Sequence, residues 1–286
     1  IDGVPIEDAG KRSGKDRRHT QFFQRDGRLL PAGANPEIGA CKYEIARPDA
    51  GCKIRINGFK AMAGKPIRAE LHCVAGGEHI GVDAVAVFTP ANTHRDIGLA
   101  CARAGKHVLM EKPLDITTAR AVELVEGCQS AGVTLGVVLQ HRFRPAGQRA
   151  AALLASGALG RVVGCATTIR LWRPQSYYDE PGRGSFARDG GGVLISQGIH
   201  TLDLMLSLVG PVTEGTGFTA TTPVHRMETE DMVCAAVRFA NGAIGTIEAT
   251  TAAYPGFHEE IMITCEHGTL ALRGGELLAQ FHDGRV

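Results

Sequence analysis

Two residues, Lys112 and His200, have types and settings that could carry chemistry. Lys112 lies in Glu111-Lys112-Pro113, directly after a short apolar run, which places it at the end of an expected strand. A lysine ammonium there can hold and polarise a substrate oxygen. A histidine titrates near neutral pH and can accept the proton that this oxygen loses. Each residue also has an ordinary reading, as a solvated surface lysine and as a satisfied core histidine.

Alternating strands and helices surround Lys112. Apolar runs, capping threonines and stop glycines predict strands over 83–88, 106–110 and 133–139. They also predict helices over 94–104 and from Thr117 or Thr118 to Ala131. Strand–helix repeats at this spacing form right-handed crossovers. The segment therefore predicts a parallel, Rossmann-like sheet with Lys112 at the carboxyl end of a strand.

His200 lies in a segment of different character. Helices are expected over 146–155 and 193–209, and strands over 162–171, 212–222, 232–239, 243–251, 261–265 and 269–272. Asn241-Gly242 between two of these strands is a strong hairpin signal. The expected fold class is therefore α/β, with an atypical N-terminal part, followed by an α+β domain with an open, mostly antiparallel sheet. The expected domains are residues 1–145 and 146–286.

Several motifs together resemble those of the Gfo/Idh/MocA oxidoreductases, from about residue 82 onward. These motifs are Thr89-Pro90-x-Asn92-x-His94, Ala104-Gly105-Lys106-His107-Val108, Glu111-Lys112-Pro113, Gly190-Gly191-Gly192 and Gly198-x-His200-x-x-Asp203. The resemblance implies a Rossmann domain that binds NAD or NADP. It implies hydride transfer between this cofactor and a secondary alcohol or carbonyl of a sugar, sugar nucleotide or cyclic polyol. It also implies a homo-oligomer formed through the free face of the C-terminal sheet.

The resemblance assigns roles to individual positions. Lys112 and His200 are the expected catalytic pair, with Lys112 also touching the nicotinamide ribose. The expected cofactor-binding residues are Thr89, Pro90, Asn92, His94, Glu111 and Lys112. The expected substrate-binding residues are Arg142, Trp172, Arg173, Tyr177, Ser196 and Asp203. Many family members have Asp or Asn where this chain has Ser196, so the proton relay and the substrate depart from the common form.

Residues 1–80 lack the G-x-G-x-x-G fingerprint with which a dinucleotide domain opens. They are rich in Gly and Pro, include the basic run Lys11–Arg18, and are expected to be loop-rich. Either this end has diverged, or the reading frame or start is wrong upstream of Val82. The C-terminus also ends earlier than the family pattern. The alternative function is therefore a non-catalytic or truncated paralogue that binds a sugar ligand or a partner subunit.

Composition excludes several other classes. The chain has 286 residues, 21% charged and 44% hydrophobic, with a formal net charge of +1. These values are typical of a globular protein and give no field that would attract nucleic acid. No apolar stretch of about 20 residues is present to span a membrane. The eight cysteines include no C-x-x-C pair, so we expect no metal site. Cys101, Cys128, Cys234 and Cys265 lie in apolar segments. We therefore expect buried free thiols and a cytoplasmic location.

Overall fold

The computed structural model describes residues 83–286 in full and, before them, the backbone of four short strands. These strands are β1 (Gln21–Phe23), β2 (Tyr43–Ala46), β3 (Lys53–Ile56) and β4 (Leu71–Val74). They lie in the region expected to be loop-rich. β2, β3 and β4 pair in an antiparallel sheet, and β1 pairs antiparallel with β5. The basic run and the glycine positions searched for a fingerprint lie outside the described residues.

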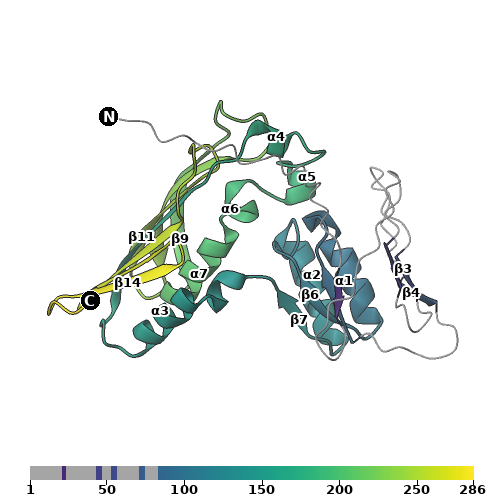
Figure 1. Cartoon of the computed structure of the whole chain (residues 1–286), viewed down its shortest axis with the longest axis horizontal. Helices are drawn as coiled ribbons and strands as arrows, with labels where there is room; N and C mark the ends of the chain where they lie inside the picture. The colour runs from purple at the N-terminus through teal and green to yellow at the C-terminus, as the bar shows by residue number, and fades with distance from the viewer. Residues whose placement is uncertain (1–20, 24–42, 47–52, 57–70, 75–82) are drawn as a thin grey trace, which may run out of the picture.

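A parallel sheet carries the Lys112 segment. β5 (Ala84–Val87), β6 (His107–Met110) and β7 (Leu135–Val137) pair in parallel, and β1 completes the order β1-β5-β6-β7. Helices α1 (His94–Arg103) and α2 (Thr118–Ser130) pack on this sheet (Figure 1). Their buried stripe includes Leu124 and Cys128, which contact the inward side chains of β5 and β6. The predicted strand–helix alternation is confirmed.

The second half contains a seven-stranded sheet, ordered β14-β13-β12-β8-β11-β10-β9. Only β8 and β11 pair in parallel. The strands are β8 (Val162–Arg170), β9 (Val212–Ala220), β10 (Met232–Phe239), β11 (Ile244–Thr250), β12 (Glu260–Cys265), β13 (Gly268–Arg273) and β14 (Glu276–Phe281). Together with the parallel sheet, this arrangement confirms the predicted fold class.

Helices cover one face of the seven-stranded sheet (Figure 1). α3 (Pro145–Ala155) and α7 (Ile199–Val209) place Ala150, Met205 and Val209 against Phe239 and Ile263 of the strands. Alternation along the strands sends every second side chain into this core. The covered face points toward the parallel sheet, so the helix that carries His200 lies between the two sheets.

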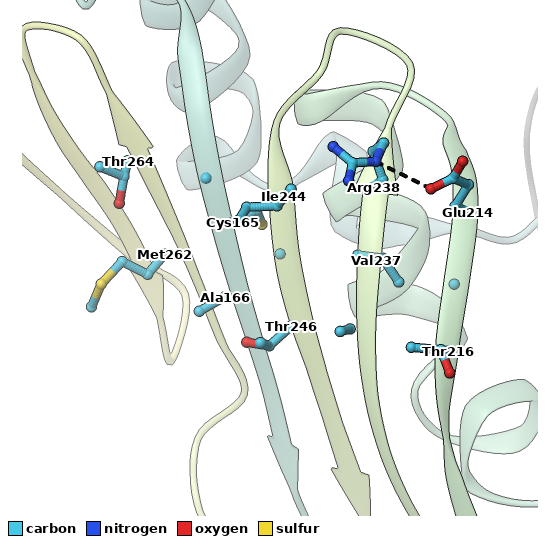
Figure 2. Close-up of a pocket in the computed structure, with 14 residues that line it drawn as sticks. Cys165, Ala166, Glu214, Thr216, Val237, Arg238, Ile244, Thr246, Met262 and Thr264 are labelled. Atoms are coloured by element: carbon cyan, nitrogen blue, oxygen red, sulfur yellow. Dashed lines mark hydrogen bonds and ion pairs between the residues drawn. The ribbon is translucent and has the colours of Figure 1, made fainter.

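No helix within residues 83–286 lies over the opposite face of the sheet, and Figure 2 shows the shallow hollow on that face. The hollow has a volume of about 710 Å³ and crosses β8 to β12. Ile244 is 60% exposed there and Met262 41%, and Phe218, on the edge strand β9 opposite Cys234, is 85% exposed. The prediction of a buried thiol is wrong for Cys234, which lies at an outward position of β10; Cys101, Cys128 and Cys265 are buried and free.

The helix expected over 193–209 is broken. It forms α6 (Val193–Ser196) and α7, and the segments 186–196 and 199–209 meet at 53°. Two further short helices, α4 (Gln175–Tyr178) and α5 (Phe186–Asp189), precede α6 and lie in the upper part of Figure 1. In the described part of the chain no single helix is long and apolar enough to cross a membrane, although this bent pair passes the same criteria by length and composition.

Candidate active site

Lys112 connects the two halves of the protein. It follows β6, and its Nζ donates a hydrogen bond to the main-chain carbonyl of Ser196 at the end of α6. Its backbone N–H donates to the Glu111 carboxylate at 2.7 Å. Because α6 leads directly into α7, this contact brings Lys112 close to the start of the helix that carries His200.

His200 is the second residue of α7 and is held as a neutral imidazole. Burial, together with the nearby Lys112, His141 and Arg144, lowers its pKa to about 4, against the attraction of Asp203. Its Nδ1 is buried and has no hydrogen-bond partner among the described residues. The ring of His141 lies 5.1 Å away between centroids. A neutral imidazole beside an ammonium group can accept a proton at physiological pH.

The glycine run before α6 allows the two halves to approach. A Cβ on Gly190, whose φ is +79°, would lie 2.6 Å from the backbone of Ile116, in the loop after Pro113. A Cβ on Gly192 would lie 1.8 Å from the carbonyl oxygen of Glu230. Only glycine fits such close backbone contacts. The run therefore sets where Ser196 and His200 lie relative to Lys112.

Two adjoining cavities lie around this junction. The large cavity has a volume of about 660 Å³ and the small cavity about 270 Å³. Both are lined by Glu111, Lys112, Tyr177, Ser196 and Gln197. The large cavity also contacts His141, Arg144, Arg173, His200 and Glu259, and the small cavity contacts Thr89, Pro90, Arg183 and Arg188. The small cavity lies at the carboxyl ends of β5 and β6, where open α/β sheets bind ligands.

Tyr177 separates the two cavities and is held firmly. Its hydroxyl oxygen accepts hydrogen bonds from Arg183 at 2.7 Å and from the Gln197 amide at 3.3 Å. The Arg183 guanidinium also lies 4.2 Å from the centre of the Tyr177 ring. With the oxygen accepting twice, the phenolic proton is left to donate into a cavity.

The four residues of the Thr89–His94 motif divide between the cavity and its support. Thr89 and Pro90 line the small cavity. The main-chain carbonyl of Asn92 accepts a hydrogen bond from Arg120 at 2.9 Å. His94 is fully buried, with its ring nitrogens 2.9 Å from the Thr89 carbonyl oxygen and 2.8 Å from that of Pro113. Its contacts join two loops, and it has no surface in either cavity.

Three predicted substrate-binding residues lie outside the linings of these cavities. Arg142 and Asp203 form a bidentate ion pair with both contacts at 2.5 Å. Trp172 packs edge-on against Tyr254, with ring centroids 5.5 Å apart. Arg173, Tyr177 and Ser196 do line the cavities, although the Ser196 hydroxyl is turned to the carbonyl of Gly191 at 3.3 Å.

Some lining residues carry no strong sequence signal. Glu259 lies in the loop before β12, outside every motif, and burial raises the pKa of its carboxyl. Gln197 and Arg144 adjoin motif residues and could have been found only by extending those motifs. Within residues 83–286, no group of three or more His, Cys, Asp or Glu side chains is arranged to hold a metal ion.

Comparison with known proteins places this architecture in a family. Residues 69–139 match the oxidoreductase family model with an NAD-binding Rossmann fold, and residues 148–271 match the GFO/IDH/MocA C-terminal domain. The chain belongs to the GFO/IDH/MocA oxidoreductase family. The two matched segments coincide with the parallel sheet and with most of the seven-stranded sheet, and the first is of the NAD-binding type.

Individual family members are similar over about two thirds of this chain. A 1,5-anhydro-D-fructose reductase of Ensifer adhaerens is 32% identical over 68% of this chain and 62% of that protein. A myo-inositol 2-dehydrogenase of Thermotoga maritima is 26% identical over 68% of this chain and 57% of that protein. The WlbA dehydrogenase of Bordetella pertussis, solved with NADH and UDP-GlcNAcA, has a TM-score of 0.67 and 34% identity, over 70% of this chain and 64% of that one. The chain therefore spans less than two thirds of the length of each.

Proposed function

We propose that the protein transfers a hydride between NAD and a secondary alcohol or carbonyl of a sugar, sugar nucleotide or cyclic polyol. The observation that carries this proposal is the position of Lys112 and His200. They come from different domains, and both line the large cavity beside the carboxyl ends of β5 and β6. This is the place where a substrate meets a cofactor in an open α/β sheet.

Lys112 and His200 have complementary roles in this reaction. The Lys112 ammonium donates a hydrogen bond to the substrate oxygen and stabilises negative charge on it. The neutral His200 accepts the hydroxyl proton at its ring nitrogen. Arg173, Tyr177 and Ser196 would contact the rest of the substrate from the lining of the large cavity. Arg142, Asp203 and Trp172 would act by supporting that lining.

The small cavity fits the nicotinamide end of the cofactor. Arg188, which lines it, has a buried Nη1 that lies 3.8 Å from the Asp189 carboxylate and has no hydrogen-bond partner among the described residues, so it can donate to a polar group of the cofactor. Thr89, Pro90, Glu111 and Lys112 line the same cavity and would hold the ring and its ribose, while Asn92 and His94 would support the loop. When bound there, NAD supplies the hydride acceptor.

The test is cofactor-dependent turnover. The full chain should form NADH from NAD with at least one member of a panel of sugars and cyclic polyols. Lys112→Met and His200→Asn should each lower kcat by about 10²-fold or more. Lys106→Met, at the opposite end of β6, is the matched control and should turn over normally. A chain that neither forms NADH nor changes NADH fluorescence on binding would be the non-catalytic paralogue instead.

The same proposal includes a homo-oligomer built on the open sheet face. Ile244 and Met262 are exposed in the shallow hollow of this face (Figure 2), and Phe218 is exposed on the edge strand β9, opposite Cys234; a second copy of the sheet could cover these apolar side chains. Phe218→Asp combined with Ile244→Asp should convert an oligomer into a monomer in light scattering. Val122→Asp, on the exposed side of α2, should leave the mass unchanged. A monomeric parent chain would contradict this part.

Two further assignments belong to the proposal. We place the domain boundary after residue 145, at the start of α3, because the parallel sheet ends before it and the seven-stranded sheet follows it. We place the protein in the cytoplasm because the five cysteines whose side chains the structure describes are all free thiols. Limited proteolysis between the domains and localisation of a tagged chain test these two assignments.

A further inference from the structure

The large cavity has a cationic wall, formed by Arg144 and Arg173, which takes no part in the proton and hydride steps proposed above. Arg144, the residue before α3, lines the cavity and has no ion pair or side-chain hydrogen bond among the described residues. Its positive charge acts to lower the pKa values of His141, His200 and Glu259. An arginine facing the reacting groups without a protein carboxylate is placed to meet an anion from outside.

Arg173 approaches the same space from the strand-to-α4 loop. One of its terminal nitrogens donates to the Trp172 carbonyl at 2.9 Å, and its guanidinium lies 5.6 Å from the centre of the Tyr177 ring. These contacts fix the position of the Arg173 guanidinium and leave its other N–H groups without a partner among the described residues. The charges of Arg173 and Arg144 both act to lower the pKa of the Glu259 carboxyl, yet neither arginine forms an ion pair with it.

The charge balance of the lining is positive. The charged lining residues are the cations Lys112, Arg144, Arg173 and Arg273 and the carboxylates Glu111 and Glu259. Glu111 already accepts the backbone N–H of Lys112. Burial raises the pKa of the Glu259 carboxyl, which weakens its ability to offset the arginines. A neutral sugar in this cavity would leave both guanidinium groups unpaired.

We propose that the substrate carries an anionic group, a carboxylate or a phosphate, which Arg144 and Arg173 hold while Glu259 accepts a hydrogen bond from a sugar hydroxyl. This inference rests on the proposed function and narrows its substrate to anionic carbohydrates. Arginine binds both anions through parallel N–H donors, and such charge-assisted bonds are about twice as strong as neutral ones. The anion anchors one end of the molecule, and Lys112 and His200 meet the reacting hydroxyl at the other.

Binding measurements test this inference without requiring turnover. Calorimetry on the full chain with NADH compares an aldose, its uronic acid and its 6-phosphate, each in the gluco, galacto and manno series. In at least one series an anionic form should bind about tenfold tighter than the neutral aldose. Preference for the uronic acid identifies a carboxylate as the anion, and preference for the 6-phosphate identifies a phosphate. Equal or weaker binding of both anions in every series overturns the inference.

Variants show which residues create the preference. Arg144→Gln and Arg173→Gln should each reduce the anion preference several-fold, and added salt should reduce it in the parent chain. Arg149→Gln removes the same charge one turn further along α3, outside the cavity lining, and should leave the preference intact. Glu259→Gln should weaken the neutral aldose, and because it removes a negative charge beside the two arginines it should not reduce the preference for the anionic form. A preference that survives both Arg144→Gln and Arg173→Gln contradicts the assignment.

Anion preference in binding and NADH formation in turnover are independent results, so a failure of this inference can be distinguished from a failure of the proposed function. Anion preference without NADH formation from any ligand supports the cationic wall and refutes the hydride transfer. NADH formation from neutral sugars, with no gain in affinity for their acids or phosphates, supports hydride transfer and refutes the anionic substrate.

Discussion

The rings of His141 and His200 lie with their centroids 5.1 Å apart and their planes tilted by 33°. Burial is the largest cause that lowers both pKa values to about 4, and Arg144 lowers both as well. Two neutral rings can pack at this distance without charge repulsion, whereas two imidazolium groups could not. The arrangement therefore keeps His200 in the form that accepts a proton.

The first prediction concerns the pH dependence of alcohol oxidation. Because the pKa of His200 is about 4, kcat/KM should stay level from neutral pH down to about pH 5 and fall near pH 4. His141→Gln removes one cause that lowers this pKa, so the acid limb should move to higher pH. A limb near the ordinary histidine value in the parent chain, unmoved by His141→Gln, would contradict this prediction.

The second prediction concerns stability and follows from the same two residues. The folded pKa values of about 4 lie below the ordinary value of 6.5, so the unfolded chain binds more protons between these limits. The free energy of unfolding should therefore fall as the pH drops from about 6.5 to about 4. Melting curves across this range should show the loss, and His141→Gln should make it shallower. His282→Gln, on an exposed turn, serves as the control.

The third prediction concerns His94, which joins the two loops that carry Thr89 and Lys112. His94 is buried and its pKa is lowered by that burial, so its neutral ring donates to one of the two carbonyl groups. His94→Leu removes this donor and the ring that packs between the two loops, and should cost about 2 to 4 kcal/mol of stability. It should also weaken NADH binding, because Thr89 lines the small cavity and Lys112 lines both. Thermal denaturation and NADH titration measure the two effects. Unchanged NADH affinity would show that the loops keep their positions without the histidine.

Much of this fold follows from local sequence pattern. The strands and helices over 83–139 carry continuous apolar runs and clear caps, and the structure places them within a few residues of the expected ends. The motifs also led to Lys112 and His200, which line one cavity. Local pattern suffices here because each element has an apolar stripe of the right period and each motif ends a strand or begins a helix.

The remaining features depend on tertiary contacts. The apolar run 193–209 predicts one helix, but the chain bends by 53° where Gly198 fits against the Val193 carbonyl. Arg142 and Asp203 are 61 positions apart, and their ion pair exists only because α7 packs beside the segment before α3. The exposure of Cys234 depends on which sheet face lacks helices. Periodicity along one segment contains none of this information.

The fourth prediction concerns the glycine run. Gly192→Ala would bring Cβ to 1.8 Å from the Glu230 carbonyl oxygen and 2.7 Å from its carbonyl carbon, so the backbone must move. This overpacking should cost about 3 kcal/mol and displace Ser196 from Lys112. Gly191→Ala is the matched control, because its Cβ meets only the Ile195 side chain, at 3.2 Å. Chemical denaturation of the two variants should separate them clearly; similar losses would contradict the packing argument.

The fifth prediction concerns His225, which holds the loop of Arg173 in place. Its Nδ1 lies 2.7 Å from the Asp231 carboxylate and its Nε2 lies 2.8 Å from the Arg173 carbonyl oxygen, with both side chains fully buried. Thr222 donates its N–H and hydroxyl to the same carboxylate, both at 2.7 Å. Removing the imidazole takes away one of three hydrogen-bond contacts to the buried Asp231 carboxylate and leaves the two from Thr222, so His225→Leu should cost about 3 kcal/mol.

The same histidine should also influence the cavity. Without the Nε2 contact, the Arg173 carbonyl loses its anchor and the guanidinium loses its fixed position beside Tyr177. His225→Leu should therefore raise KM for the substrate more than it lowers kcat, because Lys112 and His200 stay in place. His225→Gln can restore one of the two hydrogen bonds and should recover part of both losses. Equal losses of kcat and kcat/KM would instead show that His225 acts on the reacting groups themselves.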